Sequence, residues 1–266
     1  MNTEDLAKKL RLDVIEMSHR AKAAHLGSAL STIDILSVLY SSFLQIYDLD
    51  NKKYEDRDRF ILSKGHAATA LYATLAYFGI IDKEELLYYG KKGSLLEEHP
   101  STKLAGVEAS TGSLGHGLPI ANGISLSAKI LSKKFKVYVL MSDGECNEGS
   151  VWEAAMFASK NKLDNLTAIV DFNKWQATGR SQDVLQLDPF SDKWKSFGWE
   201  VIQIDGHSHK QIAEAFSQTS NEKPKLIIAD TVKGKGVSFM EDDNNWHYRS
   251  PNEEEVMLAR HELGLS

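Results

Sequence analysis

The amino-terminal stretch has the apolar spacing of an amphipathic helix. Its apolar residues recur at intervals of three and four, at Leu6, Leu10, Val14 and Met17. Such spacing places these side chains on one face of a helix. It predicts a helix over residues 3–24 that is broken at Gly27, with a second helix over residues 33–43.

Apolar strands and helical segments alternate from residue 59 onward. The predicted strands are 59–62, 137–141, 166–172, 199–204 and 225–232. The predicted helices among them are 67–79, 150–160 and 209–218, and a last helix ends the chain. Because this alternation is typical of strands joined by helical crossovers, it predicts an α/β fold, a parallel sheet with helices on both faces. We expect residues 1–266 to form a single domain.

Several connecting segments lack a regular pattern. Residues 48–59 are predicted to be a polar connector and residues 180–194 a loop. Asp82 followed by Glu85 resembles a capping box, which predicts a short helix. Residues 90–117 are long and rich in glycine, and a stretch of that kind inside a compact domain usually has a function.

The charge balance narrows the classes of partner. The chain has 31 basic and 37 acidic residues and a formal net charge of −6, so we expect neither nucleic acid nor a membrane surface as a partner. The single cysteine, Cys146, excludes an internal disulfide and suits a reducing compartment. The first twenty residues contain no apolar core of a signal peptide, and no apolar run has membrane-spanning length. We therefore expect a cytoplasmic protein.

Two polar side chains follow neighbouring predicted strands. Asp143 comes directly after the strand 137–141, and Asn173 follows the strand 166–172. Parallel strands end at the same edge of a sheet, so we expect these side chains to meet there. Their oxygens suit Mg²⁺ or Ca²⁺, with further ligands from water and a phosphorylated molecule. Gly144 permits a close approach of that molecule, although an Asp-Gly pair is also common in simple tight turns.

The segment around these residues resembles the thiamine-diphosphate motif. An apolar strand leads into Asp143-Gly144-Glu145, and about thirty residues later Asn173 follows a second apolar strand. With EGSVWEAAMFASKNKLDNL between its ends, the segment is similar to transketolases in particular. The resemblance covers essentially the whole chain and matches the N-terminal, diphosphate-binding half of a transketolase. Ser142 stands where glycine is usual, and we expect little effect because serine fits a strand end with negative φ.

Five histidines lie in loops beside glycine residues. They are His25, His66, His99, His116 and His247. Each alone is typical of an exposed or structural histidine, and no closely spaced pair predicts a zinc site. Several imidazoles in one pocket, however, could bind sugar hydroxyls and exchange protons near neutral pH.

The sequence TGSLGHG, residues 111–117, follows no strand, which argues against a dinucleotide fingerprint.

The resemblance assigns roles to individual residues. His25, His66, His99 and His247 match transketolase histidines that line the channel to the cofactor, and we take them as the candidate catalytic residues. The residues expected to contact the cofactor are His66, Gly112, Leu114, Asp143, Gly144, Glu145, Asn173, Trp175 and His247. Asp143, Asn173 and the backbone carbonyl of Trp175 correspond to the metal ligands.

Further positions concern the subunit contact and the channel. Glu148 matches a carboxylate at the contact that links two cofactor sites in the family. His116 stands where glutamine is common, so the resemblance assigns it no role. Tyr248 stands where glycine is frequent and is expected to reshape the mouth of the channel.

The resemblance also implies a partner. Thiamine catalysis requires a carboxylic acid beside the aminopyrimidine ring, and in transketolases this glutamate belongs to the pyrimidine-binding half. We therefore expect the N-terminal subunit of a split transketolase. It would be inactive alone and would transfer a two-carbon ketol unit between sugars or sugar phosphates when assembled with a C-terminal subunit into an α2β2 heterotetramer.

Two alternatives stay open at this point. The chain could be the α subunit of another split thiamine enzyme, such as a 2-oxo-acid dehydrogenase E1 component, although TGSLGHG and WHYRSP favour transketolase. It could also be a transketolase-like binding subunit without catalytic activity. The sugars themselves are open, because transketolases recognise sugar phosphate largely through the other half.

Overall fold

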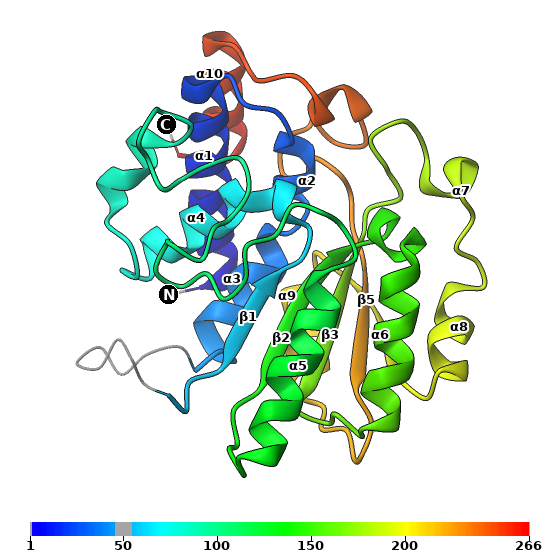
Figure 1. The fold of residues 1–266 in the computed structure, drawn as a ribbon. Helices are drawn as coiled ribbons and strands as arrows, with labels where there is room; N and C mark the ends of the chain where they lie inside the picture. Colours follow the sequence, from blue (N-terminus) through cyan, green and yellow to red (C-terminus); the bar gives the residue numbers. More distant parts are fainter. Residues whose placement is uncertain (1, 46–54, 266) are drawn as a thin grey trace.

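The computed structural model describes residues 2–45 and 55–265. These residues contain a five-stranded sheet in the order β1-β2-β3-β5-β4, in which all neighbouring strands are parallel (Figure 1). The strands are β1 (Arg59–Leu62), β2 (Val137–Ser142), β3 (Leu166–Phe172), β4 (Glu200–Asp205) and β5 (Lys225–Asp230). The predicted α/β fold with a parallel sheet is confirmed.

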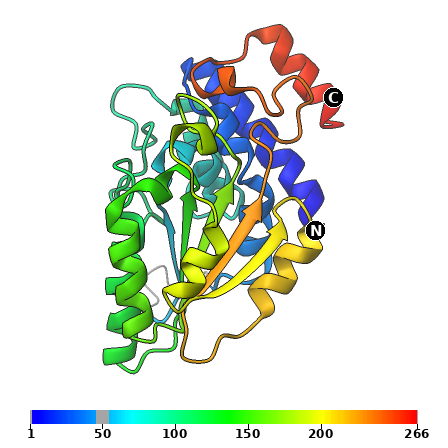
Figure 2. The ribbon, with the colours of Figure 1, turned by 90° about the vertical axis from the view of Figure 1, so that its right-hand side faces the viewer.

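Helices cover both faces of the sheet. The helices are α1 (Thr3–Ala21), α2 (Leu26–Leu30), α3 (Ile33–Ser42), α4 (Ala68–Tyr77), α5 (Gly117–Ile130), α6 (Gly149–Lys160), α7 (Ser181–Val184), α8 (Phe190–Ser196), α9 (His209–Ser217) and α10 (Glu253–Glu262). Short 3₁₀ helices are η1 (Gly65–Ala67), η2 (Lys83–Tyr88), η3 (Gly144–Asn147) and η4 (Asn244–His247). Figure 2 shows the sheet between α5 on one side and α1 and α9 on the other.

The strand β2, which lies between β1 and β3, shows why both faces must be covered. All six of its residues are buried. Successive side chains point to opposite faces of the sheet, so their burial requires that both faces be covered. Leu140 packs into the core formed with α1, α3 and α4, whereas Val139 packs into the core formed with α5, α6 and α8. A strand that is buried on both faces is apolar throughout, which is the pattern that predicted it.

The amino-terminal helix ends earlier than its spacing indicates. It stops at Ala21, where Lys22 takes a left-handed conformation (φ 51°) and its N–H donates to the carbonyls of His19 and Ser18. The prediction that Gly27 breaks this helix is wrong, since Gly27 lies inside α2. A Cβ at Gly27 would come within 3.1 Å of the Lys233 side chain, so the glycine allows that lysine to pack closely.

Other predictions for the connecting segments need correction. The segment 180–194 contains α7 and most of α8, because Phe190 and Trp194 lie four residues apart and are both buried in the core. The short helix after Asp82 is present as η2, but the Asp82 side chain makes no capping bond. Residues 48–54 of the predicted polar connector lie outside the described residues.

In the described ranges, 2–45 and 55–265, no helix combines the length and the apolar character needed to cross a bilayer.

Candidate active site

The ends of β2 and β3 bring the predicted metal-binding residues together. Ser142 pairs with Asp171 in the sheet register, so Asp143 and Asn173 follow at the same edge. The N–H of Lys174, the residue after Asn173, donates to Oδ2 of Asp143 at 3.1 Å. The convergence expected from two parallel strands is therefore present in the structure.

Asp143 is fully buried, and some of the acceptor sites of its carboxylate are taken by hydrogen-bond donors of the protein. Its Oδ2 accepts from the Lys174 N–H and, at 2.6 Å, from the Ser181 hydroxyl, while Oδ1 accepts from the Gly144 N–H at 2.9 Å. A carboxylate offers about four lone-pair sites, so Oδ1 keeps one for a cation. Burial raises the pKa of Asp143 to about 6, because it disfavours the charged form in the absence of a cation.

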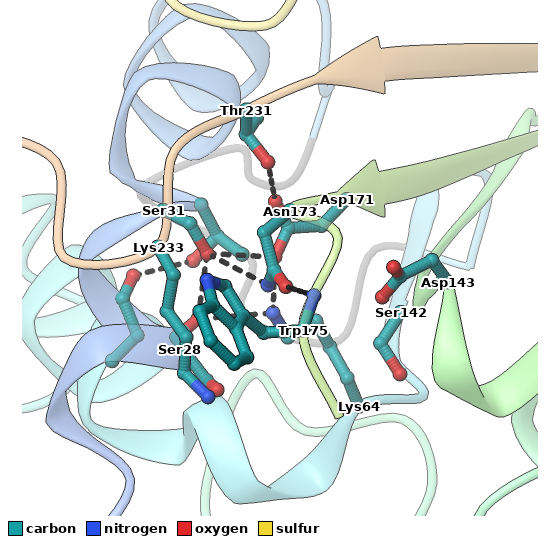
Figure 3. A network of polar contacts seen from close by, with 12 residues as sticks. Ser28, Ser31, Lys64, Ser142, Asp143, Asp171, Asn173, Trp175, Thr231 and Lys233 are labelled. Atoms are coloured by element: carbon teal, nitrogen blue, oxygen red, sulfur yellow. Dashed lines mark hydrogen bonds and ion pairs between the residues drawn. The ribbon is translucent and has the colours of Figure 1, made fainter. Parts of the chain in front are cut away.

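Asn173 belongs to a buried polar network around Asp171 (Figure 3). Oδ2 of Asp171 accepts from Lys64 Nζ, from the Ser31 hydroxyl at 2.7 Å and from Asn173 Nδ2 at 2.9 Å. Oδ1 of Asp171 accepts from the Thr231 hydroxyl. Burial raises the pKa of Asp171, but the Lys64 ammonium and the hydrogen bonds from Lys64, Thr231 and Ser31 together outweigh it and hold the pKa below its ordinary value. Among the described residues, Asn173 Oδ1 accepts from the Trp175 N–H alone, at 3.1 Å, which leaves a lone pair for a metal ion.

Ser142 fits the site without strain. It ends β2 and is not among the residues with positive φ, as predicted from its position. Its hydroxyl accepts from the Glu145 N–H at 3.2 Å and so supports the turn after Asp143. The serine adds a contact that the glycine usual in the motif cannot make.

Glu145 points into the protein. Its Oε1 accepts from the Ser63 hydroxyl and, at 2.9 Å, from the Gly115 N–H. Its Oε2 accepts from the Ser142 N–H at 3.3 Å, and burial raises its pKa. These contacts join the turn after β2 to the glycine-rich loop. Direct contact between Glu145 and the cofactor stays a prediction.

The glycine-rich loop packs tightly against the other site segments. Gly112 has φ +150° and a Cβ there would come within 3.0 Å of the His99 ring. A Cβ at Gly65 would meet the backbone of Gly112 at 2.8 Å. A Cβ at Gly115 would approach Glu148 at 2.7 Å, so the exposed Glu148 lies beside this loop at the start of α6. The half-buried Leu114 lies within the same turn.

Four of the five loop histidines form one cluster. The ring centroid of His25 lies 5.6 Å from that of His66, 6.3 Å from that of His99 and 5.0 Å from that of His247. The centroids of His66 and His247 are 6.0 Å apart. His25 has φ 69° and its N–H donates to the His247 carbonyl at 2.8 Å, which fixes the two loops together.

Burial disfavours protonation of three of the clustered imidazoles, those of His25, His66 and His247. Burial lowers the pKa of His247 to about 3, and the neighbouring Lys233 acts in the same direction. Burial likewise lowers the pKa of His25 and places that of His66 well below its ordinary value. Neutral rings can donate through one nitrogen and accept through the other, which suits recognition of hydroxyl groups.

Two other residues singled out from the sequence lie outside this cluster. His116 is exposed at the start of α5 and makes none of the ring contacts that join the four clustered histidines. Tyr248 is exposed, and its ring lies 4.9 Å from the His247 ring. Tyr248 therefore stands next to the cluster, as its predicted place at the channel mouth requires.

Sequence reasoning missed two buried lysines. Lys64 and Lys233 are fully buried, and Lys233 Nζ contacts Asn244 Oδ1 at 2.7 Å and His247 Nδ1 at 3.1 Å. Burial, with Lys64 as a second cause, lowers the pKa of Lys233 to about 8. The sequence contained a pattern that could have pointed to these lysines. Each stands next to a glycine just after a predicted strand, in SKGH and VKGKG.

Comparisons with known proteins agree with this geometry. A family model described as "Transketolase, thiamine diphosphate binding domain" matches residues 2–266. An apulose-4-phosphate transketolase subunit of Phocaeicola vulgatus is 41% identical over 97% of this chain and 92% of its own length. The 6-deoxy-6-sulfo-D-fructose transketolase subunit SqwG of a Clostridium species is 38% identical over 97% of this chain and 94% of its own length.

Longer transketolases match over less than half of their length. Human transketolase is 40% identical over 92% of this chain but only 39% of its own length. The crystal structure of Campylobacter jejuni transketolase superimposes with a TM-score of 0.94 at 32% identity, and the chain spans 44% of it. The predicted resemblance is confirmed, and the chain belongs to the family of transketolase thiamine-diphosphate-binding domains.

Proposed function

We propose that this chain is the N-terminal subunit of a split transketolase and acts as a single domain. With a C-terminal partner, it transfers a two-carbon ketol unit from a ketose to an aldose. One observation carries the proposal: four histidines from separate segments converge in one cluster, and Asp143 and Asn173 meet at the paired strand ends. The two transketolase subunits that match over nearly their whole length support a chain of this size with a separate partner.

The residues at the strand ends fit the diphosphate end of thiamine diphosphate. Asp143 and Asn173 each keep a free oxygen lone pair, and with the Trp175 carbonyl they would hold Mg²⁺ or Ca²⁺. Lys233 lies nearby as a buried cation that an anionic ligand would stabilise. When bound, thiamine diphosphate acts as the electron sink for the carbanion that ketose cleavage produces.

The histidines would bind and orient the sugar. His247 Nδ1 faces the Lys233 ammonium at 3.1 Å and so acts as the acceptor, which leaves Nε2–H to donate to a substrate oxygen. His25 lies at the centre of the cluster, in contact with the other three rings. Neutral imidazoles in this cluster could exchange a proton with a sugar hydroxyl while the carbon–carbon bond of the ketose breaks.

The proposed assembly is a heterotetramer of two such chains and two C-terminal subunits. Glu148 is exposed beside the glycine-rich loop, where the contact between subunits is expected. A cytoplasmic location is proposed as well, from the composition and the single cysteine alone.

The test is an activity measurement on separate and combined chains. Ketol transfer is assayed with thiamine diphosphate and Mg²⁺ for this chain, for its C-terminal partner and for both together. Apulose 4-phosphate, 6-deoxy-6-sulfo-D-fructose and xylulose 5-phosphate serve as donors, the first two because similar subunits carry their names. We expect transfer only from the combined chains. A complex that assembles but transfers no ketol unit from any ketose would favour the alternative of a non-catalytic binding subunit.

A further inference from the structure

The loop after Asn173 is held in a defined conformation. Trp175 and Arg180 form a β-bridge, and the N–H of Gln176 donates to the Gly179 carbonyl at 2.8 Å. The Ser181 N–H donates to the Lys174 carbonyl at 3.0 Å. Its backbone therefore fixes where Gln176 lies.

The side-chain amide of Gln176 lies against the turn after β2. A Cβ at Gly144 would come within 2.9 Å of Gln176 Cγ and 3.1 Å of Cδ. Any residue other than glycine at position 144 would therefore displace this amide. Gly144 therefore lets the Gln176 side chain lie against the turn that carries Asp143.

The amide nitrogen of Gln176 is buried without a partner. Nε2 is shielded from solvent and finds no hydrogen-bond acceptor among the described residues. A buried donor without an acceptor destabilises a protein, so native structures rarely keep one that nothing satisfies. A bound ligand that accepts a hydrogen bond from Gln176 Nε2 would explain why the protein keeps this unpaired donor.

The surroundings indicate what that acceptor is. Gln176 directly follows Trp175, whose carbonyl is a proposed ligand of a divalent cation, and its side chain packs against Gly144, the residue after Asp143. The carbonyl of the next residue, Ala177, accepts from Asn244 Nδ2 at 3.1 Å, and Asn244 Oδ1 in turn contacts the Lys233 ammonium. A proposed cation site and a buried ammonium linked to the same loop favour an anionic ligand, whose oxygens can accept a hydrogen bond.

We infer that Gln176 is a further cofactor-contacting residue, whose Nε2–H donates to an oxygen of the diphosphate group. The inference rests on the proposed function. In this arrangement Gln176, which follows Trp175 in the chain, provides a neutral hydrogen-bond donor for the diphosphate group. Its side-chain amide gains a hydrogen-bond acceptor only when the cofactor is bound.

The substitution Gln176→Met separates this role from a structural one. Methionine keeps the length of the side chain and removes the amide. If the amide has no partner before the cofactor binds, the cofactor-free complex of this chain and its C-terminal partner keeps its thermal midpoint or gains stability. The dissociation constant for thiamine diphosphate with Mg²⁺ should nevertheless rise by about tenfold or more, since a hydrogen bond to a charged oxygen is lost.

Calorimetric titration of the assembled complex measures the affinity, and magnesium pyrophosphate as a second probe isolates the diphosphate end. Gln182→Met is the matched control, because Gln182 is exposed on α7 and should change neither quantity. Wild-type affinity in Gln176→Met, or a fall in its cofactor-free thermal midpoint, would overturn the inference while leaving the proposed function intact. Absence of binding by the unsubstituted complex would instead overturn both.

Discussion

Asn173 Nδ2 lies 2.9 Å from Oδ2 of Asp171. An ionised carboxylate can only accept hydrogen bonds, so the amide nitrogen of Asn173 must face Asp171 and its oxygen must face away. Asp171 is a positioning residue in this arrangement, since it determines which atom Asn173 offers to a metal ion. Lys64 keeps Asp171 ionised and is itself fully buried, so the orientation of Asn173 depends on a buried ion pair.

Asp171→Asn should destabilise the chain strongly. It removes the charge that compensates the buried Lys64, and the loss of one partner from such a pair costs about 3–5 kcal/mol. Urea denaturation of the purified chain gives the free energy of unfolding. The double variant Lys64→Met/Asp171→Asn should recover part of the loss, because no uncompensated charge is left. Equal stability of wild type and single variant would contradict the importance of the pair.

Asp143→Asn should weaken magnesium-dependent binding of thiamine diphosphate by at least about tenfold. The substitution removes the negative charge but keeps an oxygen to accept from Ser181 and Lys174. Alanine is a poorer choice, because Asp143 is fully buried and its carboxylate accepts hydrogen bonds from Gly144, Lys174 and Ser181. Calorimetric titration of the assembled enzyme is the measurement. Asp205→Asn, at the exposed end of β4, is the control, and an equal effect of both variants would reject the metal assignment.

Each clustered histidine should contribute to ketol transfer. Alanine at His25, His66, His99 or His247 is expected to lower kcat/KM by at least about tenfold, the lower range for proton transfer or transition-state hydrogen bonding. His116→Ala supplies the matched control, since His116 is exposed outside the cluster. The measurement is the steady-state kcat/KM of the assembled enzyme for each variant. A similar small loss in all five variants would show that the cluster has no special role.

The cluster should also make stability depend on pH. An unfolded histidine binds a proton near pH 6.5, whereas folding lowers the pKa of His247 to about 3. Between these values the unfolded chain binds more protons, so the free energy of unfolding falls as the pH is lowered through this window. The fall is at most about 1.4 kcal/mol per pH unit for this residue.

Urea denaturation at pH 7 and pH 5 measures this dependence. His247→Gln should lose less stability than wild type between the two pH values. Asp143 and Glu145 have raised pKa values and act in the opposite direction, but they are present in both proteins and cancel in the comparison. An identical pH dependence in the two proteins would mean that His247 is not buried in the neutral form.

The fold was predictable because the sheet is buried on both faces. A doubly buried strand such as β2 is apolar at nearly every position, and two parallel strands necessarily end at one edge, which brought Asp143 and Asn173 together. In contrast, α8 is too short for a periodic pattern to reveal it. The left-handed Lys22 ends α1 through backbone bonds that no side-chain pattern encodes.

The site was only partly predictable for a physical reason. No spacing relates His25, His66, His99 and His247, because four separate loops carry them, and only the family resemblance indicated that they meet. The role of Asp171 depends on burial, which a single sequence does not display directly. One signal was available, since a charged residue interrupts the apolar run LTAIVDF of β3. A charge at such a position requires a buried partner, which the structure shows to be Lys64.

The last prediction concerns the surface that meets the partner. Helix α5 packs against α6 on one face of the sheet (Figure 1), and the pair leaves apolar side chains exposed. Ile120 is 37%, Met156 52% and Phe157 43% exposed. Glu148 begins α6, and the glycine-rich residues 90–117 lead into α5. Subunits that depend on each other commonly bury more than about 2,000 Å² with an apolar centre, so we expect this region to be covered in the proposed heterotetramer.

The double variant Met156→Glu/Phe157→Glu should therefore prevent assembly, because it places two charges in an apolar contact. Light scattering of this chain mixed with the C-terminal subunit gives the mass, and ketol transfer should be lost together with the complex. Met257→Glu/Leu258→Glu is the matched control, since these side chains are exposed to a greater extent but lie on α10, away from α5 and α6 (Figure 1). Assembly of the first variant with wild-type mass and activity would place the subunit contact elsewhere, and loss of assembly in the control alone would place it at α10.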